Sequence, residues 1–84
     1  MNEAQTIDAV LAWAQSGLRP EDANLIRAEA DAGEEFFAFI DALSIAESDG
    51  PALPDDLRTA VREFAKKDRE LAEELRAAAP ALAL

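Results

Sequence analysis

Residues 34–48 read EEFFAFIDALSIAES and contain three of the four phenylalanines of this 84-residue chain. The helix that this stretch predicts has a wide apolar arc, formed by Phe36, Phe37, Phe39, Ile40 and Leu43. Aromatic side chains bury the most area per residue, so we expect this arc to be the centre of the core. The two acids that open the stretch favour a helix start, because carboxylates are stabilised at the positive end of the helix dipole.

A first helix is predicted upstream, over residues 3–16. Asn2, with Gln5 three residues later, matches a capping box, in which each side chain accepts a hydrogen bond from the other residue's backbone N–H. Gly17 suits a left-handed position just past the last turn. The face expected to be buried consists of Ile7, Val10, Leu11, Ala14 and Leu18.

A second helix is predicted over residues 20–31, opened by Pro20, whose missing N–H costs nothing at the first helical position. The connection between this helix and residues 34–48 can be interpreted in two ways. Gly33 favours a short break, because glycine inside a helix costs about 1 kcal/mol relative to alanine. Apolar residues nevertheless keep three–four spacing through Gly33, so one continuous helix is the alternative.

The last predicted helix covers residues 54–79, after a turn at residues 49–53. Its stripe, which Asp68 alone interrupts, consists of Leu57, Val61, Phe64, Asp68, Leu71, Leu75, Ala78 and Leu82. Such a helix would be roughly 39 Å long, so its distal half is expected to project, or to pack against a partner or a second copy. The predicted fold is a single all-α domain over residues 1–84, a small bundle of three to four helices with a long C-terminal helix.

Charge is distributed unevenly along the chain, whose net charge is −10. Residues 1–50 hold eleven acids and two bases, a net charge of −9, whereas residues 51–84 hold seven acids and six bases, a net charge of −1. This balance disfavours direct binding to nucleic acid or to an anionic membrane, and it favours a protein partner with a basic surface. The alternative is that acidity serves only to keep a small protein in solution.

The residue types that most enzymes depend on are missing. Histidine, cysteine and tyrosine are all absent, so the commonest general base, the thiolate nucleophile and the phenolic acid are excluded. Paired carboxylates occur at Glu21/Asp22, Glu34/Glu35 and Asp55/Asp56, but each pair opens a predicted helix, where acids are expected for dipole reasons alone. We therefore expect no enzymatic activity, no metal and no cofactor.

Location is predicted from three further absences. The sequence shows no secretory signal, no apolar run near the roughly 20 residues that span a bilayer, and no cysteine for disulfides. A cytoplasmic protein is the expectation.

Three large apolar residues fall outside the predicted core stripes, namely Trp13, Leu25 and Ile45. We predict that they form a docking patch anchored by the tryptophan, because tryptophan is enriched at binding hot spots. The acids expected to surround the patch are Glu21, Asp22, Glu29, Asp31, Glu34, Glu35 and Asp41. The alternative is that the apolar residues pack at the edge of the core and that the acids form a solvated face.

Residues 9–43 carry a family resemblance. Leu11-Ala12-Trp13 lies in a helix that leads into the turn Gly17–Asp22, after which a second helix opens with proline and acids and a third covers residues 36–43. This arrangement resembles the N-terminal region of bacterial anti-sigma factors and the cytoplasmic domain of FecR-type sigma regulators. The histidine–cysteine zinc motif of many members is missing, so the resemblance is to zinc-less members. No membrane-spanning segment follows, whereas many members are membrane-tethered.

The resemblance implies a cytoplasmic inhibitor whose helices cover the polymerase-binding surface of a sigma factor, with the predicted helix 54–79 as an arm around it. A negative regulator of this type is our leading hypothesis. The second is an acidic nucleic-acid mimic, as in anti-CRISPR inhibitors, based on the charge of residues 1–50. The third is a self-associating scaffold domain, a homodimer formed through the stripe of residues 54–79.

Overall fold

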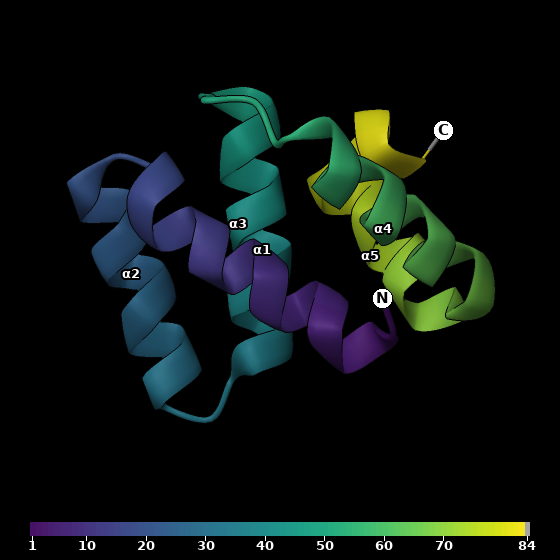
Figure 1. Ribbon diagram of the computed structural model, residues 1–84, viewed down its shortest axis with the longest axis horizontal. Helices are drawn as coiled ribbons and strands as arrows, with labels where there is room; N and C mark the ends of the chain where they lie inside the picture. Colours follow the sequence, from purple (N-terminus) through teal and green to yellow (C-terminus); the bar gives the residue numbers. More distant parts are fainter. Residues whose placement is uncertain (84) are drawn as a thin grey trace.

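The computed structural model describes residues 1–83, and the described part is all-helical (Figure 1). Its elements are α1 (Glu3–Gly17), α2 (Pro20–Asp31), α3 (Glu35–Ser48), α4 (Asp55–Lys67), α5 (Arg69–Ala78) and a 3₁₀ turn, η1 (Pro80–Ala83). α1, α2 and α3 pack on one another as a three-helix body, and α4, α5 and η1 pack together beside it. α4 contacts α1, and α5 contacts α3, so the body and the C-terminal hairpin share one core.

The predicted start of α1 is confirmed, but the predicted role of Gly17 is wrong. Asn2 Oδ1 accepts from the Gln5 N–H at 2.8 Å, and Gln5 Oε1 accepts from the Asn2 N–H at 2.9 Å, which forms the capping box. Gly17 is the last residue of the helix and does not have a positive φ. A Cβ at this position would lie 2.6 Å from Cε2 of Trp13, so the absence of a side chain lets the indole ring lie against the last turn.

The predicted break between the second and third helices is confirmed. Gly33 has a φ of 86°, in the left-handed region that glycine adopts without steric cost. Residues 32–34 therefore form a tight connection, and α3 packs along α2 as the second arm of a helical hairpin. The helix bounds predicted for the body agree with the structure to within one residue.

The long C-terminal helix predicted over residues 54–79 is wrong, because the chain breaks at Asp68. This residue is extended (φ −135°, ψ 104°), and its carboxylate accepts a hydrogen bond from the Leu71 N–H at 3.0 Å, which caps a new helix, α5. Lys66 and Lys67 lie in the last turn of α4, where cations are stabilised by the helix dipole. Residues 1–83 thus form five α-helices, and α5 turns back on α4 instead of projecting as an arm (Figure 1).

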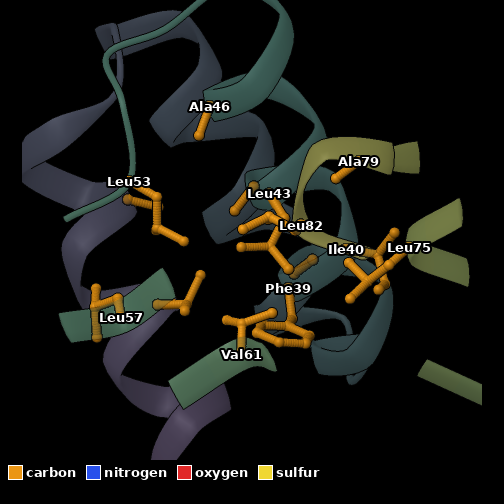
Figure 2. Packing of buried hydrophobic residues seen from close by; sticks show 14 of the residues in the cluster. Phe39, Ile40, Leu43, Ala46, Leu53, Leu57, Val61, Leu75, Ala79 and Leu82 are labelled. Atoms are coloured by element: carbon orange, nitrogen blue, oxygen red, sulfur yellow. The ribbon is translucent and has the colours of Figure 1, made fainter. Parts of the chain in front are cut away.

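Phe39 lies at the centre of the core, surrounded by side chains from both halves of the chain (Figure 2). Its ring stacks on that of Phe64 from α4 at a centroid distance of 5.9 Å, and it lies 6.3 Å from the ring of Phe36. The apolar stripe predicted on the last helix packs into this core and is not available to a partner. Its buried residues are Leu57, Val61, Phe64, Leu71, Leu75 and Leu82.

The prediction that Phe37 belongs to the core is wrong, because its side chain is 58% exposed. Residues two apart on a helix point in nearly opposite directions, so α3 cannot bury Phe37 together with Phe39. Phe37 contacts only the edge of the aromatic cluster, with its ring 6.4 Å from that of Phe36 in an edge-to-face arrangement.

Candidate protein-docking face

Two carboxyl groups meet between α2 and α3. A hydrogen bond that the protonated Glu29 carboxyl donates to Asp41, partial burial, and the negative charges of Asp41 and Glu34 together raise the pKa of Glu29 from 4.5 to about 7. The raised pKa favours the protonated form of the Glu29 carboxyl at pH values up to about 7. One oxygen of Glu29, Oε1, is buried without a hydrogen-bond partner among residues 1–83.

Exposed apolar side chains flank this pair on both helices. Leu25 precedes Glu29 by four residues on α2, and Phe37 precedes Asp41 by four residues on α3, so each apolar residue lies on the same face of its helix as the acid that follows it. Leu25 is 52% exposed and Phe37 is 58% exposed, and with Met1 they are the exposed large apolar residues of the described chain.

Because the two acids contact each other, all four side chains lie on one face of the α2–α3 hairpin. We call this set of residues, Leu25, Glu29, Phe37 and Asp41, the α2–α3 face. The hairpin is antiparallel, so the two apolar residues lie diagonally across the carboxyl pair. A surface of this kind presents apolar area and negative charge together.

The other acids predicted for the site are spread around this face. Glu34 is close enough to Glu29 for its charge to affect the pKa of that carboxyl. Asp22 is half-buried and pairs with Arg19 at 3.5 Å, so part of its charge is already balanced. The remaining predicted acids are exposed, namely Glu21, Asp31 and Glu35.

Two of the predicted apolar residues are placed differently from Leu25. Trp13 and Ile45 are half-buried and pack against the core cluster, Trp13 through the indole ring that covers Gly17. Their contacts with the core leave part of each side chain unavailable to a partner.

Phe37 is the residue of the face that sequence reasoning missed. The signal was present, because on a helix residue 37 lies about 100° from residue 36 and about 160° from residue 39, at the margin of the arc of residues 36, 39, 40 and 43. Phe37 did fit a stripe drawn through residues 30 and 33, but the break at Gly33 resets the direction of the helix. A stripe counted across a break therefore has no geometric meaning.

No group of three or more acids within residues 1–83 is arranged to hold a metal ion. None of the described helices has the length and the apolar character needed to cross a membrane. Comparisons with protein-family models, with curated proteins and with solved structures find no match to this chain.

Proposed function

We propose that this chain is a small acidic regulator that inhibits another protein by covering a basic, partly apolar surface on it with the α2–α3 face. The observation that carries the proposal is the pair of exposed apolar side chains, Leu25 and Phe37, on either side of the carboxyl pair. The three-helix body that presents this face belongs to the part of the chain with a net charge of −9.

The two kinds of side chain have different tasks in such a complex. Full burial of a leucine or phenylalanine contributes about 1.5–3 kcal/mol, so Leu25 and Phe37 would supply affinity. The surrounding acids would steer a basic partner and set its orientation. A lysine or arginine docked beside Glu29 would favour the ionised carboxylate and release its proton.

The resemblance of residues 9–43 makes a sigma factor the first partner to test. Inhibition would depend on steric cover by the body, since α5 packs on α4 and is not free to wrap around a partner. The stripe on which a homodimer was expected is buried in the core, so we do not base the proposal on self-association.

The test is parallel capture with four baits: the natural chain, Leu25→Ser, Phe37→Ser and, as control, Ala77→Ser at an exposed position on α5. We expect the natural chain and Ala77→Ser to retain a basic protein. Leu25→Ser and Phe37→Ser should fail to retain it. Purified, it should bind Phe37→Ser about tenfold more weakly, the equivalent of about 1.4 kcal/mol. A partner retained equally by all four baits would refute the α2–α3 face as the docking surface.

A second candidate is an acidic mimic that occupies the nucleic-acid channel of its partner, and the charge of the body favours it. The two candidates differ in what dominates the affinity. A mimic depends on charge, so its affinity should fall steeply between 50 and 200 mM salt, roughly as nucleic-acid binding does, and DNA or RNA should displace it. An apolar-anchored regulator should lose less affinity over that range and should be insensitive to competing nucleic acid.

A further inference from the structure

Basic residues are concentrated at the end of the molecule opposite α2. α4 and α5 contain six of the eight lysines and arginines of the chain: Arg58, Arg62, Lys66, Lys67, Arg69 and Arg76. In Figure 1 these two helices lie at the right, whereas α2 lies at the far left beyond α3.

A groove of about 430 Å³ lies between α4 and α5. α4 lines it with Thr59, Arg62 and Lys66, α5 lines it with Arg76, and Leu82 of η1 closes one side. Alanines from both helices complete an apolar floor. The groove thus combines guanidinium groups, a hydroxyl and apolar surface within the size of a small ligand.

The arginines of the groove form no ion pair with the acids of residues 1–83. No carboxylate of residues 1–83 lies within 4.0 Å of Arg62 or Arg76. Glu63, which also lines the groove, is paired with Lys66 at 2.9 Å. Arg62 is half-buried, and its Nε–H is buried without an acceptor. Its only acceptor in the described chain is the carbonyl oxygen of Ala81, at 3.4 Å from Nη2.

A half-buried cation without a counter-charge is unfavourable, because desolvation is not offset by an ion pair. A guanidinium group offers five N–H donors in a planar fork, which matches the oxygens of a carboxylate or phosphate. Burial of the Arg62 stem holds this fork in place, so little side-chain freedom would be lost on binding an anion.

We propose that the groove between α4 and α5 binds a small organic anion, whose carboxylate or phosphate group contacts Arg62 and Arg76. The hydroxyl of Thr59 donates a further hydrogen bond, and a short apolar portion of the ligand packs on Leu82. The net charge of the protein opposes anions at long range, but at 0.15 M salt charges more than about 8 Å away are largely screened. This site does not depend on the proposed regulatory function.

The test is a titration of the ¹⁵N-labelled chain, followed by NMR of the arginine Nε–Hε signals. The probes are inorganic phosphate, acetate and butyrate, with ionic strength held constant by chloride. We expect saturable shifts of the Arg62 and Arg76 signals and tighter binding of butyrate than of acetate, because only butyrate reaches the apolar floor. Saturation by phosphate alone would identify a phosphate ester as the ligand, and saturation by butyrate alone a carboxylate; either result supports the site.

Two variants with the same change of charge separate the groove from general electrostatics. Arg76→Gln removes a guanidinium from the groove at an exposed position, and it should weaken binding about tenfold through loss of a hydrogen bond to a charged group. Arg69→Gln, on an exposed part of α5 outside the groove, should change affinity by less than twofold. Linear shifts without saturation, or equal weakening in both variants, would overturn the proposal.

Discussion

Replacing Glu29 with glutamine should stabilise the fold above neutral pH and leave its stability unchanged near pH 4. In the folded chain the pKa of Glu29 is raised from 4.5 to about 7, chiefly by the hydrogen bond with Asp41. Between these two values the folded chain holds a proton that the unfolded chain has lost. Stability therefore falls as the pH rises through this window, and below pH 4.5 the penalty is absent. Glutamine cannot ionise, so it removes the penalty.

The size of the effect follows from the shift. At 1.36 kcal/mol per pKa unit, a rise from 4.5 to about 7 corresponds to at most about 3 kcal/mol. Glu29 is only partly buried, so solvent screens its interactions with Asp41 and Glu34, and we expect about 1 kcal/mol to remain. An effect of this size is a sizeable part of the stability of a domain of 84 residues.

The assay is urea unfolding between pH 4 and pH 8, followed by far-UV circular dichroism and by fluorescence of Trp13, the single tryptophan. The difference between Glu29→Gln and the natural chain should grow from near zero at pH 4 to about 1 kcal/mol at pH 8. Glu73→Gln is a matched change at an exposed position of α5 and is the control for the loss of one carboxyl group. If the curves of Glu29→Gln and the natural chain run parallel over the whole range, the carboxyl pair does not store a proton.

Substitutions at four positions test the packing. Gly17→Ala should lower the free energy of unfolding by about 1 kcal/mol, because the new methyl group would meet the Trp13 ring at 2.6 Å. Near-UV circular dichroism should report the displaced ring. Unchanged stability and an unchanged spectrum would contradict this contact. Asp68→Ala should lower the free energy of unfolding by about 1 kcal/mol, because the cap of α5 is lost. Asp68→Asn should retain most of the capping energy, since its side-chain oxygen can accept the same hydrogen bond. Equal losses in the two variants, measured by denaturant unfolding, would contradict capping by Asp68. Phe39→Ala should lower the free energy of unfolding by about 3–5 kcal/mol or prevent folding. Phe37→Ala should change it by less than about 0.5 kcal/mol, because the Phe37 side chain is exposed. Comparable losses at both positions would mean that α3 is oriented differently.

The sequence was most informative where a signal is local. The capping box of Asn2 and Gln5, the proline that opens α2, and the glycine at position 33 act within one turn of the chain, so their effects did not depend on the rest of the fold. The bounds of the first three helices were predictable for this reason.

The C-terminal hairpin was not predictable in the same way. Asp68 fits a continuous helix with one polar interruption as well as it fits a cap, and only tertiary packing distinguishes the two. Folding back buries Leu71 and Leu75 against α3 and α4, which a straight helix of roughly 39 Å could not do. Burial of these side chains outweighs the backbone hydrogen bonds lost at the break.

The candidate face was predictable only in part. An abundance of acid around the second and third helices was visible in the sequence, and so was Leu25 as an apolar residue outside the stripe. The contact between Glu29 and Asp41 depends on how two helices align across a connection of three residues, which composition and periodicity do not specify.

The uneven division of charge between the two halves has a consequence for the first moments of an encounter. The net negative charge is concentrated on the three-helix body, so the protein has a permanent dipole moment. The field of a basic surface exerts a torque on such a molecule and rotates it while the two are still separated by water. Arrival with the body foremost would raise the fraction of collisions that are productive, and this advantage would disappear at high ionic strength.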